Sequence, residues 1–249
     1  MDLSLIIPAH NEAPRLEPTL SVYSDALRAR YGDSFEIIVV ANSCSDDTAA
    51  IARGMLPAVP QIRVLDIPEA IGKGGAVLAG FRSARGARVL FADADAATLP
   101  QSLLDLADRL ETSDIVIGSR RLSASTITRS QPFTRRLLGN AFALAVRTLF
   151  DMPYRDTQCG AKAFRWDAVQ QLLPLVQETR WAFDVDILLS AQMLGLTVAE
   201  RPVVWADQQG SSVRLRSTSG QVLAAFWRMK RRQLAVAVHP SRQHAPQRS

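Results

Sequence analysis

Short apolar runs and helix-like segments alternate along the first half of the chain, and this alternation restricts the fold more than any other feature of the sequence. The apolar runs are rich in β-branched residues and have the length of strands; they cover Leu3–Ile7, Phe35–Val40, Ile62–Asp66, Ala87–Ala92 and Asp114–Gly118. The segments between them have helical patterning and cover Glu12–Arg30, Ser45–Gly54, Gly72–Arg85 and Pro100–Leu110. Such alternation predicts an α/β fold with a mainly parallel sheet and helices on both faces.

The second half of the chain is less regular. Residues 120–132 are rich in Arg, Ser and Thr and predict a mobile loop. Helical patterns follow at 133–150, 167–173 and 183–194, with a strand at Thr197–Val204. In the first half, Ser45 is the expected N-cap of its helix, with Asp46 and Asp47 in the first turn.

The composition is that of an ordinary globular protein with a sizeable core. Of its 249 residues, 47% are hydrophobic and 21% charged. Two cysteines, Cys44 and Cys159, do not make a disulfide framework and favour a reducing compartment. The first residues run directly into a strand pattern without a secretory signal, and no stretch reaches the roughly 18 apolar residues that span a bilayer. We therefore expect a cytoplasmic protein, either soluble or bound peripherally at the cytoplasmic face of a membrane.

The net charge of +5 is concentrated at the C-terminal end. Residues 208–249 hold eight of the 29 basic residues and no acid, which leaves 21 basic and 24 acidic residues in 1–207, a net charge of −3. This distribution indicates either an anionic surface near that end or a solvated tail. Nucleic-acid binding is poorly supported, because the body of the protein carries no recognised reading motif.

Two carboxylates follow a buried strand directly. Val89-Leu90-Phe91-Ala92 ends in Asp93-Ala94-Asp95, and ligands of parallel sheets lie beyond the carboxyl ends of the strands. Charges this close repel unless a cation neutralises them. Mg²⁺ and Mn²⁺ take carboxylate oxygens and complete their shell with substrate phosphates. The pair therefore predicts a Mg²⁺ or Mn²⁺ site at Asp93 and Asp95, the alternative being a pair that merely caps the following turn.

A set of motifs in a fixed order gives this pair its context. The chain resembles the family 2 glycosyltransferases of the GT-A fold, and among them the dolichyl-phosphate β-glucosyltransferase-like branch. The resemblance spans residues 3 to about 216 and rests on Leu5-Ile6-Ile7-Pro8-Ala9-His10-Asn11-Glu12, Gly72-Lys73-Gly74-Gly75-Ala76-Val77, Ala92-Asp93-Ala94-Asp95, Ile117-Gly118-Ser119-Arg120, Asp156-Thr157-Gln158-Cys159-Gly160-Ala161-Lys162, Arg180-Trp181-Ala182-Phe183-Asp184-Val185-Asp186 and Ala199-Glu200-Arg201-Pro202-Val203.

The resemblance implies roles on the donor side of the reaction. Pro8, Ala9 and Glu12 would contact the base and ribose of a nucleotide sugar, and Lys73 would lie near its phosphates or sugar. The metal at Asp93 and Asp95 would neutralise the charge released with the diphosphate. UDP-glucose is the favoured donor, with GDP-mannose as an alternative.

One departure from the family pattern concerns the donor base. Where the family usually carries paired aspartates after the second strand, this chain has Ala41 and Asn42. A carboxylate would accept a hydrogen bond from the N–H of uracil more strongly than the uncharged amide oxygen of Asn42 does. The preference for uridine is therefore open.

For the acceptor, the resemblance implies a polyprenyl phosphate. A phosphate monoester, with a second pKa of about 6, is already nucleophilic near neutrality and needs positioning by cations more than a base. Arg120, Arg135 and Arg136 resemble the family's acceptor-phosphate ligands, and the arginine fork suits two phosphate oxygens. If the acceptor were instead a hydroxyl of a soluble molecule or glycan, a carboxylate base would be necessary, and Asp184, with Asp186 beside it, is the candidate.

The C-terminal segment predicts a basic amphipathic helix. On a helix over 221–233, Val222, Leu223, Phe226, Trp227 and Met229 share one face, and the arginines 228, 231 and 232 lie opposite. A helix of this kind lies in a membrane interface or docks on the body of the protein. We expect a catalytic domain over residues 1–216, this helix within 217–238, and a disordered tail at 239–249.

Two other classes of protein share parts of this pattern. A nucleotidyltransferase would carry a glycine- and arginine-rich loop after the first strand, where this chain has Pro8-Ala9-His10-Asn11-Glu12. An inactive binding module on the same scaffold would not need Asp93, Asp95 and Arg120. The sequence therefore favours an inverting, metal-dependent hexosyltransferase.

Overall fold

The computed structural model describes residues 1–129, 133–208 and 219–238, and its centre is one mixed sheet. Seven strands lie in the order β3-β2-β1-β4-β7-β5-β8. Their bounds are β1 Leu3–Ala9, β2 Phe35–Asn42, β3 Ile62–Ile67, β4 Arg88–Ala92, β5 Ile115–Ser119, β7 Ala161–Arg165 and β8 Val198–Pro202. All neighbours are parallel except β7, which is antiparallel to both β4 and β5. The predicted mainly parallel α/β sheet is confirmed.

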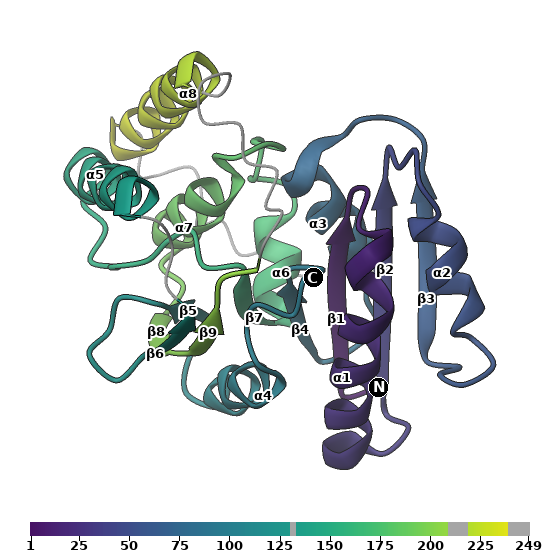
Figure 1. Cartoon of the computed structure of the whole chain (residues 1–249). Helices are drawn as coiled ribbons and strands as arrows, with labels where there is room; N and C mark the ends of the chain where they lie inside the picture. Colours follow the sequence, from purple (N-terminus) through teal and green to yellow (C-terminus); the bar gives the residue numbers. More distant parts are fainter. Residues whose placement is uncertain (130–132, 209–218, 239–249) are drawn as a thin grey trace, which may run out of the picture.

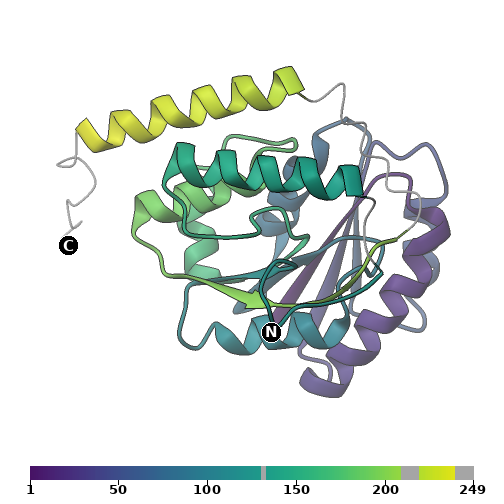
Figure 2. The same cartoon turned by 60° about the vertical axis from the view of Figure 1, so that its left-hand side comes forward.

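Helices cover both faces of this sheet (Figures 1 and 2). One apolar cluster includes residues of α1 (Ala13–Tyr31), α2 (Thr48–Gly54) and α4 (Pro100–Arg109). The cluster on the other face includes residues of α3 (Gly72–Ser83), α5 (Phe133–Phe150), α6 (Trp166–Leu172), α7 (Phe183–Leu194) and α8 (Ser219–Val238). Side chains of a strand alternate between the faces, so Leu5 and Ile7 of β1 belong to the first cluster and Ile6 to the second.

Strand β7 was not predicted. Its first two residues, Ala161 and Lys162, end a motif quoted above. The charge of Lys162 conceals the strand, although Ala161, Ala163 and Phe164 are fully buried. The strand carries the chain back between β4 and β5. Because Ala161 pairs with Ala92, the turn before Ala161 lies next to Asp93, the residue that follows β4.

Three other expectations need correction. Residues 126–129, predicted as part of a mobile loop, form β6 (Thr126–Arg129), which pairs with β9 (Val204–Ala206) in a second small sheet. The predicted strand Thr197–Val204 is divided between β8 and β9. Helix α2 begins at Thr48, not at Ser45, because Asp46 turns back to accept the N–H and the hydroxyl of Thr48.

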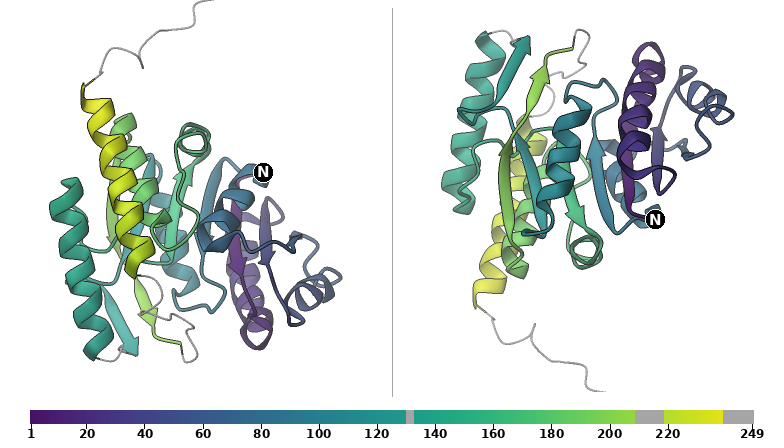
Figure 3. Two further views of the ribbon diagram at one scale, coloured as in Figure 1. Left: turned by 90° about the horizontal axis from the view of Figure 1, so that it is seen from above. Right: turned by 90° about the horizontal axis from the view of Figure 1, so that it is seen from below.

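Helices α5 and α8 lie side by side at the end of the molecule away from β3 (Figures 1 and 3). Phe226 of α8 contacts the rings of Phe142 and Phe150 of α5, with centroids 5.6 and 5.4 Å apart. Ala225, Phe226 and Met229 are buried, so α8 docks on the body through one side. The predicted tail, residues 239–249, lies outside the described part of the chain, and the domain boundary at 216 falls in the undescribed residues 209–218.

Candidate active site

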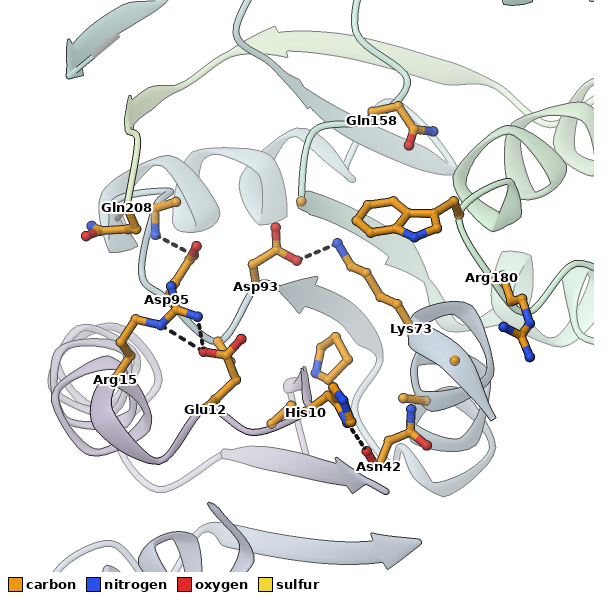
Figure 4. A pocket seen from close by; sticks show the side chains of 18 of the residues that line it. His10, Glu12, Arg15, Asn42, Lys73, Asp93, Asp95, Gln158, Arg180 and Gln208 are labelled. Carbon is orange, nitrogen blue, oxygen red and sulfur yellow. Dashed lines mark hydrogen bonds and ion pairs between the residues drawn. The ribbon is translucent and has the colours of Figure 1, made fainter. Parts of the chain in front are cut away.

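A pocket of about 540 Å³ opens at the carboxyl ends of β1, β2 and β4 (Figure 4). Of the residues predicted to bind donor, metal or acceptor, the pocket is lined by Pro8, Ala9, Glu12, Asn42, Lys73, Asp93, Asp95 and Arg120. The three strands are neighbours in the sheet, and the carboxyl ends of parallel strands meet at one edge. Residues from four separate motifs are thereby brought together.

Backbone strain is concentrated in the loops that form this pocket. Asn11, Ser43 and Ala96, which follow β1, β2 and β4, have φ values of 55°, 52° and 50°. Side chains other than glycine rarely adopt this region, and such strain persists where the surroundings fix it, commonly at functional sites. None of these three conformations was predicted from the sequence. They turn the chain sharply at each strand end and present His10, Asn42 and Asp95 to the pocket.

The two predicted metal ligands lie at the pocket floor in different surroundings. Asp93 forms an ion pair with Lys73 at 2.5 Å, whereas Asp95 accepts the N–H of Ala97 at 3.0 Å. Burial raises the pKa of Asp95, and the charge of Asp93 raises it further. Lys73 supplies one positive charge beside these two carboxyl groups. Two carboxyl groups are oxygen donors of the kind that a hard cation takes when phosphate ligands complete its shell. Within the described residues there is no group of three or more His, Cys, Asp or Glu side chains that could hold a metal ion.

Lys73 reaches Asp93 from the first turn of α3, and the two side chains face each other in Figure 4. Burial acts to lower the pKa of Lys73, but the charges of Asp93 and Asp184 outweigh it, so the pKa lies above its ordinary value. A cation is therefore held at the edge of the carboxylate pair. An ammonium here also suits an anionic ligand such as a diphosphate.

The turn before β7 lies directly against the carboxylate of Asp93. A Cβ built on Gly160 would overlap the Asp93 carboxylate. Gln158 and Gly160 line the pocket, and the carbonyl of Cys159 accepts the ammonium of Lys162 at 2.7 Å. A side chain at position 160 would displace the Asp93 carboxylate from the position that it has here.

Glu12 and Asn42, which are predicted to contact the donor nucleotide, both line the pocket. Glu12 pairs with Arg15 at 2.6 Å, and burial raises its pKa against the opposing charge of Arg15. Asn42 accepts the N–H of Ile71 with its amide oxygen at 3.0 Å, and its backbone carbonyl is 2.8 Å from Nδ1 of His10. One lone pair of the Asn42 amide oxygen therefore already accepts a hydrogen bond from Ile71. The other lone pair and the amide N–H₂ are the groups that Asn42 has for bonding a ligand.

Arg120 lines the pocket but is anchored by Asp156. The carboxylate of Asp156 accepts Nε and Nη2 of Arg120 at 2.7 and 2.8 Å, and the guanidinium lies 5.4 Å from the ring centre of Trp205. Burial would raise the pKa of Asp156, but Arg120 holds it below its ordinary value. Glu200 in turn accepts the backbone N–H groups of Arg155 and Asp156. Arg120 is thus held in place by Asp156 while it lines the pocket.

Asp184, Asp186 and Arg136 are not among the residues that line the pocket. Asp184 is buried and bonds Lys162, which is fully buried, at 2.5 Å. Its neighbour Asp186 is fully buried under α8 and accepts Arg232. Arg136 is exposed on α5 away from the lining, and the side chain of Arg135 lies outside the described residues.

Several lining residues had no predicted role. Arg15 stands three residues after Glu12, one helical turn away, and this spacing could have identified it. Arg180 and Trp181 stand in a quoted motif without an assigned function. Gln208 follows β9, and Gln221 belongs to the first turn of α8. Gln208 and Gln221 belong to no quoted motif, and the tertiary fold brings them to the pocket.

Comparison with known proteins decides the family. The model of glycosyl transferase family 2 matches residues 4–172. The chain belongs to glycosyl transferase family 2. It is therefore a glycosyltransferase, and the predicted family and enzyme class are confirmed.

Several of the similar curated proteins carry the same name. A dolichyl-phosphate β-glucosyltransferase of Dictyostelium discoideum is 34% identical over 244 residues, covering 93% of this chain and 75% of that protein. The Homo sapiens protein of the same name is 32% identical over 224 residues, covering 85% and 69%. The similarity thus extends past the family model into the C-terminal part of the chain.

Solved structures of other glycosyl-group-transferring proteins share the fold. Glucosyl-3-phosphoglycerate synthase from Mycobacterium tuberculosis, in complex with Mn²⁺, UDP and glucosyl-3-phosphoglycerate, superposes with a TM-score of 0.69 at 21% identity, covering 92% of this chain and 79% of that chain. TarS from S. aureus with UDP-GlcNAc gives 0.63 at 18% identity, covering 94% and 66%. The GT-A fold expected from the family motifs is confirmed.

Proposed function

We propose that this family 2 enzyme transfers glucose from UDP-glucose to a polyprenyl phosphate, with inversion at the anomeric carbon and with Mg²⁺ or Mn²⁺ bound at Asp93 and Asp95. The observation that carries the proposal is the meeting of Asp93, Asp95 and Lys73 in one pocket with the nucleotide motif of β1. The names of the similar curated proteins support glucose and a dolichyl-type acceptor. The complexes of the structural neighbours support a uridine nucleotide and Mn²⁺.

In this reaction an oxygen of the acceptor phosphate forms a bond to the anomeric carbon while the bond from that carbon to the donor diphosphate breaks. UDP leaves with the electron pair. When bound at Asp93 and Asp95, the metal supplies positive charge to the diphosphate. Lys73 supplies a second positive charge, and Glu12 with Arg15 and Asn42 closes the base and ribose end. Arg120, held by Asp156, orients the acceptor phosphate.

No general base is required by this scheme, because the acceptor phosphate is already ionised near neutral pH. The burial of Asp184 against Lys162 agrees with this, since a carboxylate base must reach the proton that it removes. Asp184 instead supports the turn before β7 through Lys162. That turn forms one wall of the pocket beside Asp93.

The acceptor is a lipid, and we place its membrane contact on α5 and α8 together. Large apolar side chains are exposed on both helices: Leu137, Leu138, Leu144 and Leu149 on α5, and Leu223, Trp227 and Leu234 on α8. Leu223 is 69% exposed and Trp227 62%. Adjacent exposed apolar side chains on a soluble surface mark an interaction site. We call these seven side chains the α5–α8 apolar face.

The charges around this face suit anionic lipid head groups. Neither α5 nor α8 contains an acidic residue, and Arg136, Arg147 and Arg231 are exposed on them. Such helices bury their apolar side in the interface while arginines meet the phosphates. In the described part of the chain no helix is long and apolar enough to cross a membrane. Gln221 of α8 and Trp181 line the pocket, so a head group held at this face is close to the site.

The proposal is tested by incubating the protein with UDP-glucose labelled in the sugar, Mn²⁺ and a short polyprenyl phosphate, then extracting the product into organic solvent. We expect a labelled glycolipid, and none with the corresponding polyprenol. GDP-mannose in place of UDP-glucose checks the donor. Transfer to hydroxyl acceptors without any to the phosphate would overturn the proposed acceptor.

A further inference from the structure

The segment of residues 177–182, which precedes α7, lies between the C-terminal helix and the first turn of α3. Two of its residues, Arg180 and Trp181, line the pocket. Its other residues make the contacts that hold it in place. These contacts come from two sides, and one side is α8.

On the α8 side, two arginines hold the segment through carboxylates. Arg228 donates from Nε and Nη2 to the two carboxylate oxygens of Glu178, at 2.9 and 2.8 Å. Arg232 donates to Asp186, which is fully buried and also accepts the backbone N–H groups of Gln177 and Glu178 at 2.7 and 2.8 Å. Paired N–H donors of this kind fix the geometry of a carboxylate more firmly than a single bond.

On the other side, the segment supports the start of α3. The carbonyl of Thr179 accepts the N–H of Gly75 at 3.0 Å. A Cβ on Gly72 would lie 2.6 Å from that carbonyl oxygen, and a Cβ on Gly74 would overlap Phe183. These glycines allow α3 to approach the segment closely. Lys73, which pairs with Asp93, stands between them.

We infer that Arg228 and Arg232 of α8 are positioning residues of the active site: they fix the 177–182 segment, which in turn fixes Arg180, Trp181 and the first turn of α3 with Lys73. Helix α8 therefore does more than attach the enzyme to a lipid surface. Both arginines bond to carboxylates of the body, Arg228 from an exposed side chain and Arg232 from a largely buried one, whereas Arg231 lies over the ring of Trp227 on its own helix, 4.7 Å from the ring centre.

Hydrogen exchange of the full chain in solution, without lipid, tests this inference. The variants are Arg228→Glu, the reversed pair Arg228→Glu with Glu178→Arg, and the matched control Arg231→Glu, which changes the charge of α8 equally. We expect peptides containing residues 72–76 and 177–182 to exchange at least about threefold faster in Arg228→Glu. The reversed pair should restore slow exchange, and Arg231→Glu and peptides of β1 should be unchanged.

Equal exchange in Arg228→Glu and the wild type would overturn the inference. Exchange that stays fast in the reversed pair would place the effect outside the ion pair and would also overturn it. A second measurement links the contact to the reaction and rests on the proposed function: KM for UDP-glucose should rise about threefold or more in Arg228→Glu while kcat changes less. If the wild type proves inactive on UDP-glucose, the proposed function fails, whereas the exchange comparison still decides the positioning role.

Discussion

The ammonium of Lys73 lies 2.5 Å from a carboxylate oxygen of Asp93, so one of the two proposed metal ligands is already paired with a cation of the protein. The metal that we propose at Asp93 and Asp95 would share or displace this contact. Lys73 then becomes available to the diphosphate of the donor. In this proposal Lys73 competes with the metal when no donor is bound. When the metal is bound, the freed ammonium of Lys73 favours binding of the donor.

Lys73→Ala should therefore have opposite effects on the two ligands. We expect tighter binding of Mn²⁺ alone, because the competing ammonium is gone, and a KM for UDP-glucose about tenfold higher, because a charge-assisted hydrogen bond to the donor is lost. Calorimetry with Mn²⁺ and steady-state kinetics measure these. Arg82→Ala, an exposed residue at the other end of α3, is the control. Weaker Mn²⁺ binding in Lys73→Ala would contradict the competition.

The pair Arg120–Asp156 predicts a pH dependence of stability. The folded pKa of Asp156 lies below its ordinary value of 3.8, so its contribution is present above that value and is lost as the pH falls through the folded pKa. Asp156→Asn should destabilise the protein by about 3 kcal/mol near neutral pH, because Arg120 loses a buried partner. The difference from wild type should stay constant from about pH 8 to about pH 5 and narrow only below the ordinary value. Urea unfolding at several pH values measures it, and a gap that narrows around neutral pH would contradict this account.

Substitution of Asp184 should lower the stability of the fold, because Asp184 is a buried partner of Lys162 and not a catalytic base. Asp184→Asn leaves the fully buried Lys162 without its carboxylate, which costs about 3–5 kcal/mol. Replacing the pair by Lys162→Met with Asp184→Leu should cost less than Asp184→Asn alone, because no unpaired charge is left buried. Asp167→Asn, which removes an exposed ion pair with Arg165, serves as the control, at under about 1 kcal/mol. A fully stable, inactive Asp184→Asn would instead identify Asp184 as the base of a hydroxyl-directed transferase.

The α5–α8 apolar face should determine membrane binding. Leu223→Ser with Trp227→Ala and Leu144→Ser removes three exposed apolar side chains without touching the buried side of either helix. Full burial of one such side chain contributes about 1.5–3 kcal/mol, so the partition coefficient onto anionic vesicles should fall at least about tenfold. Leu56→Ser, an exposed leucine after α2, is the control. Unchanged cosedimentation of the triple variant would place the membrane contact elsewhere.

Much of the fold and the donor side of the site follow from local patterns. The apolar runs predicted β1 to β4, and the rule that ligands lie beyond strand ends correctly placed Pro8, Asn42 and Asp93 in one pocket. These predictions succeed because parallel strands are buried on both faces and carry little else but apolar residues.

What the patterns missed depends on partners far away in the sequence. Lys162 can stand inside a buried strand only because Asp184, 22 residues later, accepts it. Asp186 looks like an ordinary charge in the first turn of a helix, yet its partner Arg232 is 46 residues away. The predicted apolar face of α8 is divided: Phe226 and Met229 are buried, whereas Leu223 and Trp227 are exposed. Which of these side chains is buried depends on how α8 packs on α5 and α7, and the sequence of α8 does not specify that packing.

The central claim is that a cation held by Asp93 and Asp95 enables the donor bond to break. Its most direct test compares wild type with Asp93→Asn and Asp95→Asn combined, after chelator treatment and then with Mn²⁺ restored. We expect wild-type glycolipid formation to vanish with chelator and to return with Mn²⁺, while the double variant, folded by thermal melting, stays at least about 10³-fold slower at every Mn²⁺ concentration. Full turnover by the chelator-treated double variant would contradict the account.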